Sequence, residues 1–119
     1  MKVTLIEFGK ETESGRTYLR HQCETPKQTY CSLEHLVDKH GMAILNPPIN
    51  GEKTCGFAEM SMDDVGIHVE VKPFSDERGK MFDEKMMDGF RLAPLGTGSL
   101  NESGEVKDYM LHYVYLKKD

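Results

Sequence analysis

The residue types best suited to metal chemistry gather in the first third of the chain. Cysteine and histidine occur there at five positions, which are His21, Cys23, Cys31, His35 and His40. Thiolate and imidazole groups are the ligands that zinc prefers. The spacing fits no standard zinc site, because no C-x-x-C pair is present and a short helix would point His35 and His40 to different sides. We predict no metal and no cofactor; the alternative is a small metal enzyme built on His21, Cys23, Cys31 and His35.

A cysteine and a histidine in the middle of the chain could form a nucleophile and its base. Cys55 and His68 fall on consecutive expected strands, where they could be cross-strand neighbours. Paired strands also bring side chains together without any chemistry, and we expect a buried, inert Cys55 and a His68 on the surface. No catalytic residue is predicted, and a small Cys-dependent hydrolase is the alternative.

Glycines are concentrated in the segment Leu95–Ser99, which raises the question of a phosphate-binding loop. The segment lacks the Lys-Ser/Thr ending of such loops, and no strong helix follows it. We predict instead a hairpin loop in which Gly96 or Gly98 adopts a positive φ. Carboxylates are abundant, but their spacing fixes no pair in one cleft, so no acid–base pair is predicted.

The segment Phe90–Leu116 is expected to organise the fold. Phe90–Leu95 is predicted to be one strand, and a second strand is predicted from Glu105 to Leu116. Between Tyr109 and Leu116 every residue except His112 is apolar or aromatic. A run of this kind is typical of a strand with both faces covered, and its tyrosines and valines favour β-structure over a buried helix.

The first half of the chain predicts four short elements. Lys2–Phe8 and Thr17–Cys23 are expected to be strands that form a hairpin. Ser32 is a good N-cap for a helix over Leu33–His40. A short strand is expected at Met42–Leu45, ended by Asn46-Pro47-Pro48 and followed by a turn at Asn50-Gly51.

The middle of the chain gives the clearest periodicity. Thr54–Ser61 and Val65–Lys72 predict a hairpin, and alternating apolar residues in its second strand indicate one buried and one exposed face. Lys80–Asp88 predicts a short helix that Gly89 ends. We therefore expect a single domain over residues 1–119, of the α+β class, strand-dominated, with a mainly antiparallel sheet and two short helices.

Composition limits the classes of partner. The formal net charge is −5 and the basic residues are scattered, which argues against nucleic acid. No segment is apolar enough for a membrane span, and the N-terminus has no signal-peptide pattern. Three cysteines without an export signal favour reduced thiols and a cytoplasmic location.

The second half of the chain, Thr54 to Leu116, resembles a known family. The run GFRLAPLGTGSLNESGEVKDYMLHYVYL is similar to the closing segment of phage prohead maturation proteases of the T4 type. The shared positions are Gly96, Gly98, Gly104, Val106, Asp108 and Leu111. The catalytic pair of that family is not kept, because Ala93-Pro94 stands at the serine position and Cys55-Gly56 at the histidine position. The resemblance implies a phage-encoded relative that has lost the protease chemistry.

The preferred interpretation is a small non-enzymatic protein that binds a protein partner. The resemblance implies a role in virion assembly, whereas small size and acidity fit an inhibitor of a host factor; the oligomeric state is open at this point. The edge of Lys2–Phe8 could pair with a strand of the partner. The loop Ala93–Asn101 is the second expected surface, with Pro94, Leu95, Thr97 and Asn101 as predicted partner-binding residues.

Overall fold

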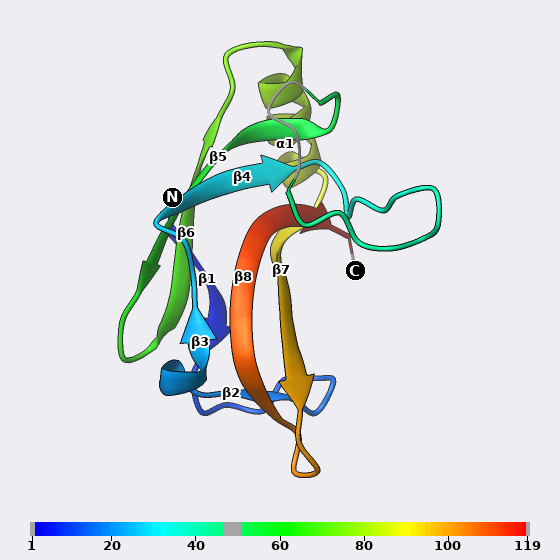
Figure 1. The fold of residues 1–119 in the computed structure, drawn as a ribbon. Coiled ribbons are helices and arrows are strands. Elements are labelled where there is room, and N and C mark those ends of the chain that lie inside the picture. The colour runs from blue at the N-terminus through cyan, green and yellow to red at the C-terminus, as the bar shows by residue number, and fades with distance from the viewer. Residues whose placement is uncertain (1, 47–50, 119) are drawn as a thin grey trace.

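Strands make up most of the regular structure in the computed structural model, which describes residues 2–46 and 51–118 (Figure 1). They are β1 (Lys2–Glu7), β2 (Thr17–Tyr18), β3 (Cys23–Glu24), β4 (Gln28–Ser32), β5 (Thr54–Met62), β6 (Gly66–Pro73), β7 (Arg91–Leu100) and β8 (Glu105–Lys117). The α-helix α1 (Glu77–Met87) and the 3-10 helix η1 (Arg20–Gln22) are the helical elements of this part of the chain. The strand-dominated α+β class is confirmed, but one α-helix replaces the two predicted. Within the described ranges no helix has the length and apolarity needed to cross a membrane.

The sheet is mixed, so the predicted mainly antiparallel sheet is wrong. Its strands follow the order β1-β6-β5-β4-β8, and β7 pairs with the opposite edge of β8. The ladders β1–β6, β5–β6, β4–β5 and β7–β8 are antiparallel. β2, β3 and β4 pair in parallel with successive parts of β8. The 13 residues of β8 are long enough to serve three partners along one edge and β7 along the other.

The predicted hairpin of Lys2–Phe8 with Thr17–Cys23 does not form. β1 is confirmed as a strand, but it pairs with β6. The expected second strand is split into β2 and β3 by η1, and both pieces join β8. The chain still reverses at Gly15, whose N–H donates to the Thr12 carbonyl, and Glu11 forms an antiparallel bridge with Thr17. The local turn therefore forms, but it does not pair β1 itself with β2.

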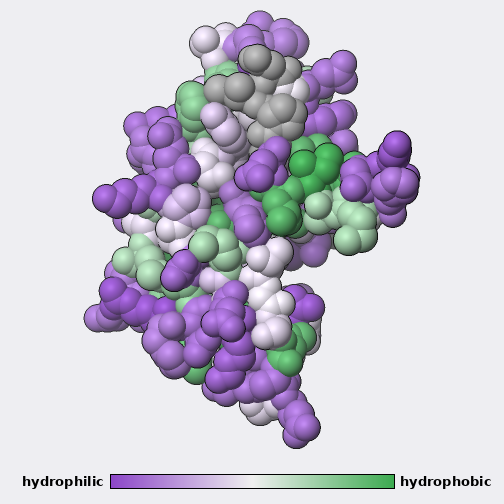
Figure 2. All heavy atoms as spheres, in the orientation of Figure 1, coloured by the Kyte–Doolittle hydropathy of each residue, from purple (hydrophilic) through white to green (hydrophobic). Residues whose placement is uncertain are grey.

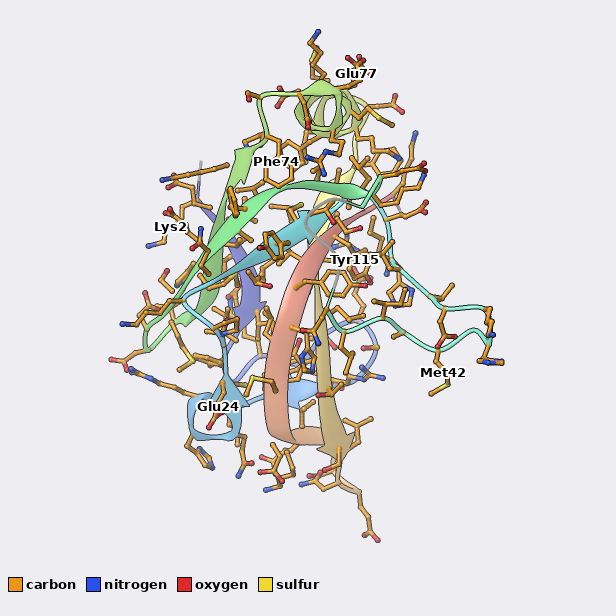
Figure 3. The ribbon with its side chains drawn as sticks, turned by 45° about the horizontal axis from the view of Figure 1, so that its top comes forward. Lys2, Glu24, Met42, Phe74, Glu77 and Tyr115 are labelled. Carbon is orange, nitrogen blue, oxygen red and sulfur yellow. The ribbon has the colours of Figure 1, made fainter. Side chains whose placement is uncertain are left out.

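The predicted helix Leu33–His40 is wrong as well. Ser32 ends β4, its Oγ donates a hydrogen bond to the Glu34 carbonyl, and its Oγ accepts one from the Glu34 N–H. These local bonds pair the N–H and C=O groups of Glu34 in a turn, so Ser32 does not cap a helix. The following loop is held by a bridge between Val37 and Ala43, and no strand forms over 42–45 (Figure 3 shows Met42 far from the sheet). Of the expected Asn46-Pro47-Pro48 and Asn50-Gly51 turns, residues 47–50 lie outside the described residues.

The middle elements agree with the sequence. β5 and β6 form the predicted antiparallel hairpin, although Val65 is exposed and His68 is buried, the reverse of the prediction. The predicted second helix is confirmed as α1, which begins earlier because the Asp76 side chain accepts a bond from the Arg78 N–H. Gly89, with φ 88°, follows the helix end as expected.

The predicted loop over residues 96–99 is wrong, because β7 continues to Leu100. Gly96 and Gly98 are not among the glycines with positive φ; the turn before β8 uses Gly104, with φ 86°. A glycine is needed at position 96 for space, since a Cβ there would collide with the Tyr109 ring. The glycine-rich segment therefore marks the place where β7 passes close to the Tyr109 ring, and it does not mark a loop.

The core is built mainly by the strands of the curved sheet, and α1 contributes Phe82 to it. Its buried members come from every long strand except β7 and include Ile6, Cys31, Cys55, Met60, Ile67, Val69, Phe82, Leu111, Val114 and Leu116. Met62 and Met86 pack against this core, whereas Met87 is exposed.

Replacing Gly96 by alanine is expected to destabilise the fold. The new methyl group would push the buried Tyr109 ring, and overpacking of this kind costs about 1–3 kcal/mol of unfolding free energy. Urea denaturation monitored by circular dichroism measures the change. Ser99→Ala, on an exposed position of the same strand, is the control, and equal stability of both variants would contradict the role of Gly96.

Candidate functional site

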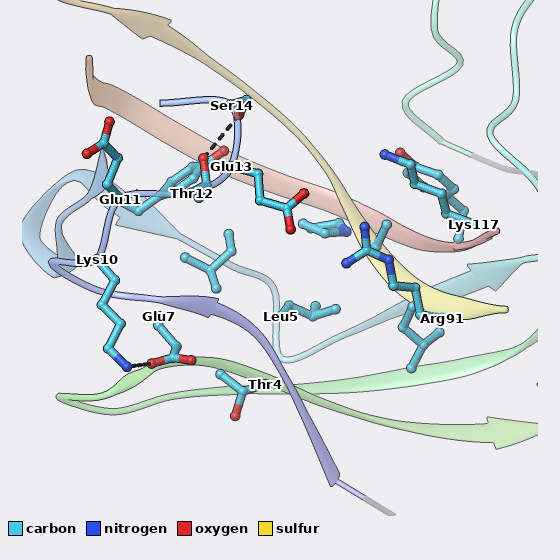
Figure 4. A pocket seen from close by; sticks show the side chains of 16 residues that line it. Thr4, Leu5, Glu7, Lys10, Glu11, Thr12, Glu13, Ser14, Arg91 and Lys117 are labelled. Atoms are coloured by element: carbon cyan, nitrogen blue, oxygen red, sulfur yellow. Dashed lines mark hydrogen bonds and ion pairs between the residues drawn. The ribbon is translucent and has the colours of Figure 1, made fainter. Parts of the chain in front are cut away.

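A groove of about 560 Å³ separates β1 from β7 (Figure 4). One wall is the second half of β1, from Thr4 to Glu7, and the other is the start of β7, from Arg91 to Pro94. The loop after β1 borders one end of the groove. Tyr115 and Lys117 of β8, which pair with Ala93 and Arg91, extend the wall that β7 forms. A second hollow, of about 390 Å³, lies elsewhere, between Arg16, Tyr18 and the end of β7.

The groove exists because the curved sheet does not close. Within the described part of the chain, β1 pairs only with β6 and β7 pairs only with β8, although β1 and β7 approach one another. Following the ladders around the sheet shows that β1 and β7 run in the same direction. Each strand therefore keeps one edge without a ladder partner, and these edges border the groove.

The two edges differ in what they offer a partner. Pro94 lies in the first half of β7 and has no N–H, a residue that sheets tolerate on edge strands. β1 contains no proline, so its open edge keeps its N–H groups, although the register shift between Thr4 and Ile6 interrupts their regular alternation. β1 is therefore the better template for an added strand.

The loop after β1 gives one end of the groove an acidic character. Lys10 Nζ lies 2.7 Å from Glu7 Oε2, and this hydrogen bond raises the pKa of Lys10. Glu11 and Glu13 have no ion-pair partner among residues 2–46 and 51–118. The Thr12 and Ser14 hydroxyls lie 3.0 Å apart and the Arg16 N–H donates to Thr12 Oγ1, which shapes the loop. Both glutamates thus belong to an ordered turn at the groove.

A buried histidine fixes β1 against the β5–β6 hairpin. His68 Nε2 lies 2.9 Å from Asp63 Oδ1, and His68 Nδ1 lies 2.9 Å from Thr4 Oγ1. The His68 bond, together with the N–H groups of Gly66 and Val65, lowers the pKa of Asp63 to about 2. Because Asp63 is ionised at neutral pH, its Oδ1 accepts the hydrogen bond from His68 Nε2.

This order of hydroxyl, imidazole and carboxylate is also that of a catalytic triad. Here Thr4 and His68 are cross-strand neighbours on β1 and β6. Asp63 also accepts a hydrogen bond from the Val65 N–H in the turn before β6. We therefore assign these three side chains a structural role. Sequence reasoning missed it because His68 was expected on the surface. The five-residue spacing of Asp63 and His68 across a predicted turn was the available signal.

The four predicted partner-binding residues lie on β7 or directly after it and have different surroundings. Pro94 lines the groove, whereas Leu95 is half-buried opposite Tyr113 in the β7–β8 ladder. Thr97 Oγ1 lies 2.9 Å from His112 Nε2. Asn101 stabilises the turn before β8, where its side chain accepts bonds from the N–H groups of Ser103 and Glu105.

The residues considered for enzyme chemistry are dispersed. His68 lies opposite Ser61, while Cys55 lies near the far end of the hairpin, where its carbonyl accepts from the Phe74 N–H. Cys55 Sγ instead donates to the Cys31 carbonyl at 3.3 Å. His35 contacts the Tyr115 ring. Nowhere in the described ranges do three Cys, His, Asp or Glu side chains gather as a metal site would require.

Comparisons of the chain with protein-family models, with curated proteins and with solved structures gave no match. The resemblance to phage prohead proteases therefore stays a prediction. In the structure Ala93 and Pro94 lie on β7, and Cys55 and Gly56 lie on β5.

The three thiols are expected to be protected in the native protein. All are buried; burial raises the pKa of Cys23, and a hydrogen bond with Cys55 together with burial raises that of Cys31. Since the thiolate is the reactive form, an aromatic disulfide reagent should label them only after denaturant is added. A thiol that reacts rapidly in the native protein at pH 6 would contradict this and favour the Cys-dependent hydrolase.

Asp63 should contribute to stability above its ordinary pKa and lose that contribution in acid. Its folded pKa of about 2 lies below the usual 3.8, so the unfolded chain binds the proton more readily. The melting-temperature advantage of the wild type over Asp63→Asn should thus be full above pH 4 and shrink as the pH falls towards 2. Asp83→Asn, on an exposed position of α1, is the control. A difference that is constant over this pH range would contradict the assignment.

Proposed function

We propose that this chain is a non-enzymatic protein-binding protein and that the groove between β1 and β7 is its binding surface. The observation that carries the proposal is the open edge of β1 along the groove. An exposed strand edge binds extended segments through main-chain hydrogen bonds, while pockets beside it select side chains. The buried thiols and dispersed histidines support a binding role over an enzymatic one.

Two biological settings fit such a protein. The resemblance of Thr54–Leu116 to a phage protease that lacks its serine and histidine supports a role in virion assembly. Small size and a net charge of −5 support inhibition of a host factor. In both settings the partner is a protein, and we place the phage-encoded chain in the host cytoplasm.

A second exposed apolar surface lies on the loop between β4 and β5, where Figure 2 shows hydrophobic atoms beside the hydrophilic surface. Val37 and Met42 are the large apolar side chains exposed there. We favour the groove because it combines main-chain donors and acceptors with concave walls, whereas this loop offers side chains alone.

Filling the groove should abolish partner capture. Ala93 is half-buried and lines the groove, so Ala93→Trp would occupy the space of a partner segment. Tagged wild-type protein and the variant are incubated with lysate of the infected host, and the retained proteins are compared by mass spectrometry. We expect the proteins captured by the wild type to be lost with Ala93→Trp, with melting temperatures within a few degrees.

Met87→Trp is the matched control, because Met87 is 90% exposed on α1, outside the residues that line the groove. It should capture the same proteins as the wild type. Equal capture by Ala93→Trp would show that the groove is not the binding surface. Retention of capsid or scaffold proteins would favour assembly, and retention of one host enzyme would favour inhibition.

A further inference from the structure

We infer that the groove binds an extended peptide segment that runs antiparallel to β1 and begins with basic residues. This inference rests on the proposed function and adds the direction and charge pattern of the partner segment. Three features support it: the direction of the two walls, the missing donor at Pro94 and the placement of Glu11 and Glu13.

The direction follows from the topology. β1 and β7 run the same way, so a segment antiparallel to β1 is antiparallel to both walls. Antiparallel pairing is also slightly more stable per residue than parallel pairing. Because Pro94 removes a donor from β7, the ladder forms on β1, and β7 contributes side-chain contacts.

The charge pattern follows from the direction. The first residues of a segment antiparallel to β1 lie beside the last residues of β1, next to the loop that carries Glu11 and Glu13 (Figure 4). These carboxylates have no cationic partner within the described chain, whereas Glu7 is paired with Lys10. Lys or Arg at the start of the segment would form ion pairs with Glu11 and Glu13.

The middle of the groove favours apolar side chains. Leu5 and Ile6 from β1 and Leu92 from β7 line it, and Leu5 and Leu92 are half-buried. Side chains of a strand alternate between its faces, so every second residue of the segment would point into the groove. The expected ligand is therefore an extended segment with a basic start followed by alternating apolar residues.

A displayed library of random peptides about ten residues long, enough to span the six residues of β1, tests this without the natural partner. Peptides that bind the wild type but not Ala93→Trp are selected, and their affinities are measured by fluorescence anisotropy. We expect Lys or Arg at their N-terminal ends. Glu11→Lys combined with Glu13→Lys should weaken binding about tenfold, as expected for two exposed charge contacts turned repulsive.

Two controls isolate the charges. Asp83→Lys with Glu102→Lys makes the same change in net charge at exposed positions outside the groove lining and should leave the affinity unchanged. Peptides with Glu in place of their basic residues should bind the Glu11→Lys, Glu13→Lys protein better than the wild type. The rescue identifies a direct contact, because a structural defect would not be repaired by the ligand's charge.

The inference and the proposed function fail in different ways. Groove-dependent peptides without charge preference, or with basic residues at their C-terminal ends, would overturn the inference and leave the groove as a binding surface. Loss of all groove-dependent binding, of peptides and of lysate proteins, would overturn both. Light scattering that gave twice the chain mass, reduced to one by Ala93→Trp, would overturn the inference in favour of a second copy on β1.

Discussion

The structure depends on β8 being paired along both of its edges. β7 follows one edge for almost its whole length, and β2, β3 and β4 follow one another along the other. A strand in this position has no solvent-facing edge, and its alternating side chains contribute to the core from both faces, as the buried Leu111, Tyr113, Val114 and Leu116 show. The parallel addition of β4 joins the β5–β6 hairpin and β1 to β8, so both halves of the sheet are positioned by this one strand.

The groove is a consequence of that arrangement. Because β7 occupies one edge of β8, the sheet continues on the other side through β4, β5 and β6 to β1, and its curvature brings β1 back towards β7. Closing the sheet would require pairing β1 directly with β7, two strands that run in the same direction, and Pro94 withholds one donor from that ladder. The open side therefore follows from topology and from one residue type, and it leaves main-chain groups available beside concave walls.

The sequence predicted the elements that local signals control. The β5–β6 hairpin has strong alternation, α1 is delimited by Asp76 and Gly89, and the apolar run of β8 is long. It failed where distant contacts decide. β4 was missed because its partners in β5 lie 22 or more residues away, as the pair Ser32–Thr54 shows, and its partners in β8 lie much further away, as the pair Cys31–Val114 shows. The helix over 33–40 lost to the Ser32 turn and to a bond from the Leu36 N–H to the Tyr113 hydroxyl.

The candidate site was predictable only in part, for the same reason. The edge of Lys2–Phe8 was expected as a binding edge, but its opposite wall was not, because only the curvature of the sheet brings residues 91–94 to it. Thr97 and Asn101 stay predictions as partner-binding residues, and the structure adds that their side chains bond to His112 and to the turn before β8. Sequence alone does not distinguish a polar residue that stabilises a turn from one that binds a partner.

β1 is held by hydrogen bonds and by packing although one edge is open, and this bears on binding. The Thr4–His68–Asp63 connection holds β1 to the hairpin, Ile6 is buried in the core, and the Phe8 and Gly9 N–H groups bond to Val65 and Tyr18. A strand fixed in its extended conformation before a ligand arrives loses little further conformational entropy on binding. The main-chain groups at the groove are thus preorganised, and the affinity of an incoming segment depends chiefly on its own ordering and on the side chains it presents to the walls.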